Sequence, residues 1–473
     1  MSTNADYTTT PQGTAKPRIP PLIWLSCVTA ATCGLLFGLH AGIMAGAIDF
    51  IRSDFNTTAS MEGWIIGAML AGAAIGALGA SAISNALGRK RSLLLSGALF
   101  FVGALLACMA TTAEMLITAR ALLGLAIGIE SFVVPLYLSE VAPQHIRGTV
   151  IASFQLMITI GILIAYLINM AFNSSGNWEW MLGVTMVPAA LMIIGVLCLP
   201  ESPRWQASRG AMDKAEATLK RLTGSDTDTA REMSGIRNAL NAQSGSKVKG
   251  GALFLSNSNF RRCVLLGILI QAMQQFSGIN AVIYYAPKIF EMANFQGTGT
   301  IVSTVAVGTV NLLATIVAVA FADRWGRKPI LYAGFAIMAI SMAVLGLILH
   351  IGATNVALQI AAVAALLIFI VGFAMSIGPL AWALCAEIQP TQGRDFGLGC
   401  STIANWVSNM LIGTYFLVLL SSIGGPATFA LLAGANVLFF LLTFFLVPET
   451  KGVLLEEIES NLMKGMPLRR LGR

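Results

Sequence analysis

The sequence predicts an all-α membrane protein whose twelve transmembrane helices form two six-helix halves. Of its 473 residues, 56% are hydrophobic and only 11% are charged, and the mean hydropathy is +0.77. A soluble protein carries about 25% charged residues, so this composition indicates many membrane spans. Short polar motifs of the first half also return in the second half in the same order, which indicates a duplicated unit.

Each of twelve apolar segments is long enough to cross a bilayer. The expected helices cover 22–48, 61–84, 92–110, 114–138, 149–172, 180–199, 261–289, 299–321, 330–350, 356–386, 397–421 and 426–447. A polar stretch rich in Lys, Arg, Glu and Ser separates the sixth from the seventh. The expected order is therefore an N-terminal tail (1–21), a first half (22–199), a helical linker (200–260), a second half (261–447) and a C-terminal tail (448–473).

Basic residues indicate the orientation, because Lys and Arg concentrate in cytoplasmic loops. Of the 29 Lys and Arg, only Arg52 and Lys288 lie in connections from an odd to an even helix. We therefore expect both termini in the cytoplasm, and we attribute the net charge of +7 to topology and not to a nucleic-acid surface. The seven cysteines lack CxxC or metal-ligand spacing, which indicates small buried side chains and neither disulfides nor a metal site.

The seventh expected helix carries three carboxamides, Gln274, Gln275 and Asn280. Amides inside a membrane are costly unless they find partners or line a wet cavity. Each offers donors and an acceptor, which suits a neutral ligand rich in hydroxyl groups. No charge lies between Arg262 and Lys288, so a phosphorylated or carboxylate ligand would have no counter-ion. The cluster predicts a site for a neutral polar ligand.

The same helix contains two residues that favour a break. Gly278 invites local unwinding and Pro287 invites a kink. Discontinuous helices with polar groups at mid-depth hold substrate in transporters. The alternative is that the amides only join neighbouring helices, which we favour for Gln271.

Three motifs of the first half have similar counterparts at the corresponding positions of the second half, at the cytoplasmic ends of helices. Their acidic and basic side chains can pair across the halves and latch the cytoplasmic side, or can simply anchor loops at the lipid headgroups. The pairs are LGRKRS (87–92) with WGRKPI (325–330), SEVAPQHIRG (139–148) with AEIQPTQGRDFG (386–397), and PESPRW (200–205) with PETKG (448–452). The candidate latch residues are Arg89, Glu140, Arg147, Glu201, Asp323, Arg327, Glu387 and Arg394.

These motifs, with QQFSGINAVIYYAP and GRDFG, resemble the sugar porter family of the major facilitator superfamily over about residues 22–465. The stretches AEIQPTQGRDFG, CSTIANWVSNM and EEIESNLMKG are most similar to the bacterial galactose–proton and arabinose–proton symporters of that family. The resemblance implies the major facilitator fold and a twelve-helix alternating-access carrier for a monosaccharide, working without nucleotide, cofactor or metal.

The resemblance also implies roles for individual residues. The sugar-binding positions of the family match Gln155, Gln274, Gln275, Asn280, Asn311, Trp382 and Asn405. Its outer gate matches Tyr284 and Tyr285, and its flexible break in the tenth helix matches Gly378 and Pro379. Asn409 is either a further ligand or a contact between helices.

Two positions depart from the family's pattern. His40 stands where the proton symporters of the family carry an aspartate, and Glu130 stands where a small residue is expected. Arg120 matches the arginine that pairs with that aspartate. A neutral His40 favours uncoupled transport, whereas Glu130 is either a relocated proton site or a polar contact between helices. In the first motif pair, Asn85 also replaces an acidic residue, which weakens the first half's latch.

The sequence thus predicts import of a neutral monosaccharide, either a hexose such as galactose or glucose, or a pentose. The family resemblance implies proton symport; an uncoupled uniporter is the alternative, and a sugar sensor is a third. Drug efflux fits poorly with neutral amides. We expect a monomer in the bacterial inner membrane, in contact with the lipid bilayer, with a monosaccharide and protons as partners and no nucleic acid.

Overall fold

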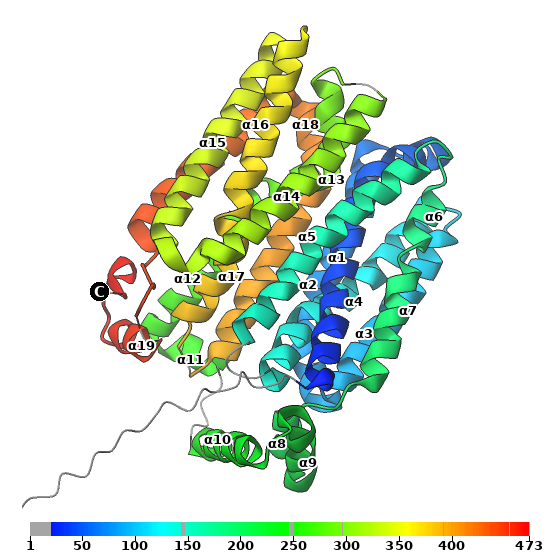
Figure 1. The fold of residues 1–473 in the computed structure, drawn as a ribbon. Helices are drawn as coiled ribbons and strands as arrows, with labels where there is room; N and C mark the ends of the chain where they lie inside the picture. Colours follow the sequence, from blue (N-terminus) through cyan, green and yellow to red (C-terminus); the bar gives the residue numbers. More distant parts are fainter. Residues whose placement is uncertain are drawn as a thin grey trace, which may run out of the picture.

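The computed structural model describes residues 20–142, 147–245, 250–295, 297–390, 392–453 and 455–472. In these ranges the regular structure is helical, and no strand occurs. Long helices run side by side, and three polar helices, α8 (Pro203–Ser208), α9 (Met212–Thr223) and α10 (Asp226–Gly245), lie beyond one end of them (Figure 1). The predicted all-α membrane fold is confirmed.

Eleven helical segments of the described residues are long and apolar enough to cross a membrane. The first six are formed by α1 (Pro21–Phe55), α2 (Ala59–Leu87), α3 (Arg89–Cys108), α4 (Ala113–Val141), α5 (Arg147–Phe172), and α6 (Trp178–Gly183) with α7 (Met186–Cys198). The others are formed by α12 (Ser258–Phe276) with α13 (Ile279–Met292), α14 (Thr298–Trp325), α15 (Arg327–Ile351), α16 (Val356–Ala374) with α17 (Ile377–Ile388), and α18 (Arg394–Leu446). We refer to α1–α7 as the N-terminal helices and to α12–α18 as the C-terminal helices.

Helix α18 accounts for the difference between the eleven segments and the twelve predicted helices. Its 53 residues would extend about 80 Å if straight, more than twice the thickness of a bilayer core. The backbone leaves the helical conformation at Gly424, where φ is 78° and ψ is 165°, and Pro426 follows. Glycine tolerates this positive φ without strain. The two arms of α18 correspond to the eleventh and twelfth predicted helices.

Other spans are broken near their middle. At Gly278 φ is 101°, so α12 ends and α13 begins there, and Tyr285 is also non-helical just before Pro287. Both breaks of the seventh helix are as predicted. The tenth helix is interrupted at Ser376 (φ −125°, ψ −104°), two residues before Gly378. These breaks free backbone carbonyl groups inside the bundle.

Close contacts between helices depend on small residues. A methyl group added at Gly124 or Gly128 of α4 would overlap the backbone of α2 at Met69 or Ala73. Membrane helices approach this closely where small residues let the backbones meet, because lipid supplies no hydrophobic force between them. The same holds between the two groups of helices, where Gly67 of α2 faces the Thr414 hydroxyl of α18.

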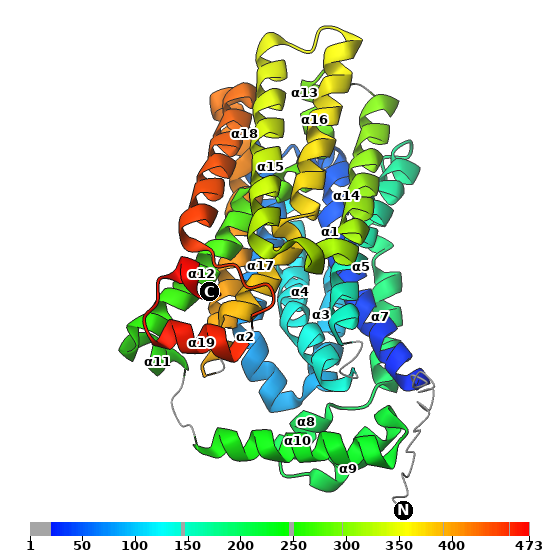
Figure 2. The ribbon, with the colours of Figure 1, turned by 60° about the vertical axis from the view of Figure 1, so that its left-hand side comes forward.

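The polar linker forms its own small cluster. Buried Ala207, Ala215, Leu219, Met233 and Ile236 join α8, α9 and α10. Figure 2 shows α10 lying across the end of the bundle, with the C-terminal helix α19 (Leu455–Met463) beside α11 (Gly250–Ser256) and α12. The predicted linker range therefore contains α8 to α11. All seven cysteines are free thiols.

Candidate functional site

A network of carboxamides joins α12, α13 and α18. Asn405 of α18 donates through Nδ2 to the Oε1 atoms of Gln271 (2.7 Å) and Gln274 (2.6 Å). Its Oδ1 accepts from Nε2 of Gln275 at 3.1 Å, and Asn280 donates to Oε1 of Gln275 at 2.6 Å. Asn405 uses both N–H donors and its carbonyl oxygen, so it is the centre of the network.

The break at Gly278 positions this network. It lets Asn280 at the start of α13 donate back to Gln275 at the end of α12, while Gln274 and Gln275 bond to Asn405 of α18. Nε2 of Gln274 also donates to the Gly378 carbonyl at 2.7 Å, next to the break before α17. Polar side chains thus bind carbonyl groups that the interrupted helix leaves available.

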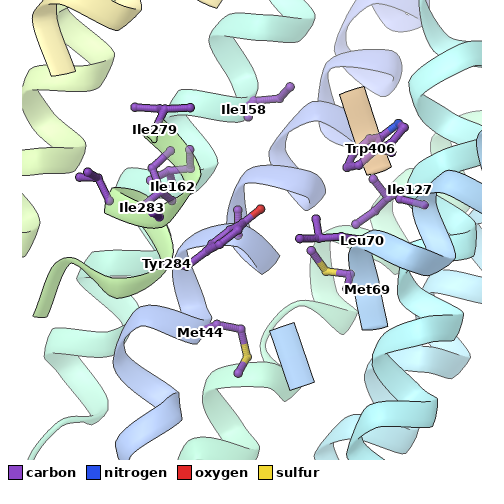
Figure 3. Packing of buried hydrophobic residues seen from close by; sticks show 14 of the residues in the cluster. Met44, Met69, Leu70, Ile127, Ile158, Ile162, Ile279, Ile283, Tyr284 and Trp406 are labelled. Carbon is purple, nitrogen blue, oxygen red and sulfur yellow. The ribbon is translucent and has the colours of Figure 1, made fainter. Parts of the chain in front are cut away.

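Two tyrosines close one side of the bundle next to the network. Tyr284 and Tyr285 are almost fully buried, and they donate to Oδ1 of Asn409 (3.3 Å) and to the Gly413 carbonyl (2.7 Å). Tyr284 points from α13 toward Leu70 in Figure 3. The cavity left between α1, α13 and α18, which both tyrosines line, measures about 10 Å³. A space of that size holds at most one water molecule, so no sugar passes there in this conformation.

The other predicted site residues lie outside this hydrogen-bond network. Gln155 is partly buried on α5 and Asn311 is buried on α14, and neither side chain bonds to the amides in the part of the chain that the structure describes. Trp382 of α17 is 38% exposed, whereas most of that helix is buried. Pro379 follows Gly378 in the first turn of α17.

Gln271 and Trp406 complete this region, and no role was predicted for Trp406. Gln271 joins α12 to Asn405 of α18, which agrees with its predicted role as a contact between helices, and its buried Nε2 has no partner within the described residues. Trp406 is 3% exposed, packs edge-on against Phe37 at 5.3 Å, and leaves its Nε1 without a partner there too. An indole N–H inside a span needs an acceptor, and this requirement could have singled out Trp406.

His40 is fully buried on α1 and contacts Thr185, between α6 and α7. Its Nε2 lies 3.0 Å from the Thr185 hydroxyl oxygen, and that hydroxyl donates to the Leu182 carbonyl at 2.6 Å. With the hydroxyl proton on the Leu182 carbonyl, the tautomer that suits this contact is the one in which Nε2 of His40 carries the proton. The buried Nδ1 has no partner among the described residues, and Phe100 packs edge-on against the ring.

Arg120 and Glu130 are buried on α4 and do not pair with each other, as their spacing predicts. Nε of Arg120 donates to the Ile65 carbonyl of α2, and Nη2 lies 3.5 Å from the Met69 sulfur. Both carboxyl oxygens of Glu130 lack a hydrogen-bond partner in the described residues. The nearby Ser96 hydroxyl of α3 donates instead to the Leu93 carbonyl at 2.9 Å.

The ion pairs at the helix ends join helices of the same group. Arg89 binds Glu140 through Nε (2.9 Å) and Nη2 (3.0 Å), and Arg327 binds Glu387 at 2.9 Å. We predicted pairing across the two halves. In this conformation these four residues pair within their own group of helices instead. The Arg394 guanidinium binds the Gln389 carbonyl, and the side chains of Arg147 and Asp323 lie outside the described residues.

Two further carboxylates cap helix N-termini. Oε1 of Glu201 accepts from the backbone N–H groups of Arg89 and Lys90 at the start of α3. Glu449 accepts in the same way from Arg327 and Lys328 at the start of α15. Burial raises the pKa of the Glu449 carboxyl, but these N–H groups and that of Lys451 outweigh it and hold the pKa below its ordinary value. Glu201 of PESPRW and Glu449 of PETKG thus have the same role, in agreement with the predicted correspondence of the two motifs.

The helical architecture and the buried amides agree with one group of known proteins. A family model described as "Sugar (and other) transporter" matches residues 26–462. The chain belongs to this sugar transporter family. It is therefore a transporter and not an enzyme, and it is a multi-pass protein of a bacterial inner membrane.

Curated relatives match the transporter over nearly its whole length. It is 52% identical over 447 residues to the galactose-proton symporter of Escherichia coli (strain K12), covering 94% of this chain and 96% of the relative. It is 47% identical over 449 residues to the arabinose-proton symporter of the same strain, covering 94% of each chain.

Solved structures agree with the fold. The inward open conformation of the xylose transporter XylE from E. coli superposes with a TM-score of 0.79 at 27% identity, covering 93% of this transporter and 99% of XylE. The partially occluded inward open conformation of XylE gives a TM-score of 0.78 at 26% identity, covering 90% and 100%. The predicted major facilitator fold is thus confirmed.

Proposed function

We propose that this transporter imports a neutral monosaccharide, a hexose such as galactose, together with protons. The observation that carries the proposal is the network around Asn405, in which amides from three helices meet without a charged side chain between Arg262 and Lys288. Asn280 is half-buried and uses its N–H group on Gln275, which leaves its carbonyl oxygen to accept from a sugar hydroxyl. The high identity to galactose-proton and arabinose-proton symporters supports the same conclusion.

The sugar lies, in this proposal, between the network and Trp382. Gln155, Asn311, Gln274, Gln275, Asn280 and Asn405 supply hydrogen bonds, and the exposed indole of Trp382 covers an apolar face of the ring. Tyr284 and Tyr285 form the outer gate, and Gly378 with Pro379 lets α17 move. Since Tyr284 bonds to Asn409, that asparagine acts on the gate.

Replacing Trp382 with alanine should raise the KM for sugar about five- to tenfold, because a stacking surface is lost. Trp382→Phe should keep most of the affinity. Trp180→Ala is the matched control, since Trp180 is 56% exposed on α6 and lies far in sequence from the amides. Uptake of labelled sugar by transport-deficient cells measures the effect. Unchanged uptake in Trp382→Ala would make Trp382 a packing residue.

Proton coupling, in this proposal, uses Glu130 and not the family's usual position. A buried carboxylate without donors would be costly, so Glu130 is expected as a neutral acid in this conformation. His40 donates to Thr185 and has no bond to Arg120, so it cannot replace the aspartate as a partner of that cation. Glu130 is the acid left to release a proton when the conformation changes.

Sugar added to native proteoliposomes should cause alkalinisation outside, and Glu130→Gln should abolish it while sugar exchange continues. His40→Asp should strengthen the signal by restoring a carboxylate beside Arg120. An external pH electrode measures this. Alkalinisation that survives Glu130→Gln would make His40 the proton carrier. Its absence in the native chain would favour the uniporter, which the neutral His40 also supports.

The proposal also covers the arrangement of the two halves, the linker and the terminal tails. Two halves, 22–199 and 261–447, rock about the central site, with the linker 200–260 and both terminal tails, 1–21 and 448–473, in the cytoplasm. The transporter works as a monomer. The ion pairs Arg89–Glu140 and Arg327–Glu387 stiffen each half, and pairing across the halves through Arg147, Glu201, Asp323 or Arg394 would belong to the conformation open to the outside.

A further inference from the structure

A second cavity lies at one end of the C-terminal helices, and none of its lining residues belongs to the amide network. It measures about 500 Å³ and is lined by Lys328, Pro329 and Tyr332 of α15, by Phe444 of α18, by Glu449, and by Arg469 and Arg470. These helix ends are the ends of membrane spans. The cavity therefore lies where lipid headgroups meet the protein, on the cytoplasmic side in the proposed orientation.

Three cations line this cavity against one carboxylate, and that carboxylate is already engaged. Glu449 accepts from the backbone N–H groups of Arg327 (2.9 Å), Lys328 (3.0 Å) and Lys451 (3.0 Å). Arg469 and Arg470 are exposed and form no ion pair within the described part of the chain. Their guanidinium groups are available to an anion from outside the protein.

The two arginines stand on an anchored segment. Leu471 is fully buried, and Nδ2 of Asn461 donates to its carbonyl at 3.0 Å. Arg262 of α12 binds the Met466 carbonyl at 3.2 Å, and a side chain at Gly472 would overlap the Glu449 backbone. Figure 2 shows this C-terminal segment (red) folded against the end of the bundle. The backbone that carries the two arginines is thus already ordered, so binding a ligand does not have to order it.

The other wall of the cavity is aromatic. The Lys328 ammonium lies 5.9 Å from the Tyr332 ring centre and 5.8 Å from that of Phe444, and it donates to the Phe444 carbonyl. The Tyr332 ring packs against Phe440 at 5.2 Å. A ligand that fits both walls has an anionic group next to an apolar part.

The related place among the N-terminal helices is built differently. Lys90 donates to the Leu197 carbonyl at 2.7 Å, and Glu201 caps α3, as Lys328 and Glu449 do at α15. There the chain continues into α8, where Arg209 binds the Asn85 carbonyl at 2.6 Å and lies over the Trp205 ring. Arginines that are available to a ligand therefore occur at the cavity of the C-terminal helices and not at the corresponding place among the N-terminal helices. The capping of a helix start by glutamate, which both places share, does not require such arginines.

We propose that this cavity binds a phosphate ester, with Arg469 and Arg470 on the phosphate oxygens and the Tyr332 and Phe444 rings beside its apolar part. Arginine matches phosphate geometry through paired N–H donors, and basic pockets at the cytoplasmic ends of membrane helices hold anionic headgroups. The chemistry fits an anionic phospholipid such as phosphatidylglycerol, and the same phosphate group also occurs in free phosphorylated metabolites.

The test compares the native full-length chain with Arg469→Gln/Arg470→Gln in nanodiscs of phosphatidylcholine mixed with phosphatidylglycerol. Native mass spectrometry of the protein released from the discs counts the lipids that stay bound. The native chain should retain phosphatidylglycerol preferentially, and the double variant should lose about 30-fold in that preference. Arg469→Lys/Arg470→Lys should keep most of it. Lys464→Gln/Arg237→Gln, which removes two exposed cations outside the cavity, should change nothing.

A second arm distinguishes the two sources of phosphate. Inorganic phosphate and glycerol 3-phosphate are added to lipid-free protein in detergent, and the melting temperature is measured. A rise in the native chain that the double glutamine variant lacks, with equal lipid retention in both, would support a site for free phosphorylated compounds. Equal lipid retention and no phosphate-dependent shift would overturn the proposal. Because neither arm measures sugar uptake, this result is independent of the proposed transport function.

Discussion

Replacing Arg89 with alanine should lower the free energy of unfolding by about 3–5 kcal/mol. Arg89 and Glu140 form a two-bond ion pair between α3 and α4, and their side chains are only 9% and 6% exposed. Removal of the arginine leaves the Glu140 carboxylate buried without its cation, and this uncompensated charge accounts for most of the loss. Thermal unfolding of the purified protein in detergent measures it as a lower melting temperature.

Lys220→Ala is the matched control for this experiment. Lys220 also forms a 2.9 Å ion pair, with Asp226, but the two side chains are 65% and 81% exposed. Solvent screens such a pair, so its removal should have little effect on the melting temperature. Equal melting temperatures for Arg89→Ala and the native chain would show that the buried pair does not hold α3 and α4 together.

Asn405→Ala should weaken sugar binding about 5- to 150-fold, more than any other single amide substitution in the network. Three glutamines, Gln271, Gln274 and Gln275, bond to this one side chain. Without it they lose their fixed directions, and their donors and acceptors turn toward each other or toward water. Equilibrium binding of labelled galactose to the purified protein gives the Kd.

The control for Asn405 is Asn436→Ala. Asn436 is equally buried in α18, but within the described residues its amide bonds only to the backbone carbonyls of Ser277 and Leu432. Asn436→Ala should lower the stability of the protein and leave the Kd for galactose nearly unchanged. If Asn405→Ala bound sugar as tightly as the native chain, the network would be a structural contact between helices and the sugar site would lie elsewhere.

The sequence predicts the spans and the breaks well, because both follow from local chemistry. Length and hydropathy set the helices, and Gly278 and Pro287 mark the two breaks of the seventh span. The predicted helices 397–421 and 426–447 lie on either side of Gly424, where α18 breaks. The residue types of the amide site were also evident, because polar groups in an apolar helix are unusual.

Partners could not be predicted, because they depend on which way each side chain points. Gln271 and Asn405 are 134 positions apart, and nothing local shows that their amides meet. The contact of His40 with Thr185 spans 145 positions and joins α1 to the start of α7. Pairing of Arg89 and Arg327 within their own groups of helices, rather than across them, was missed for the same reason.

Galactose accumulation in proteoliposomes under an imposed pH gradient tests whether the transporter couples sugar import to protons. Labelled galactose should accumulate above its external concentration when the outside is acidic, and a protonophore should abolish this accumulation. Asn405→Ala should greatly reduce it, whereas Asn436→Ala should not. Galactose that enters only to equilibrium, whatever the pH gradient, would contradict proton symport. Failure of galactose and other neutral monosaccharides to enter at all would contradict the sugar site itself.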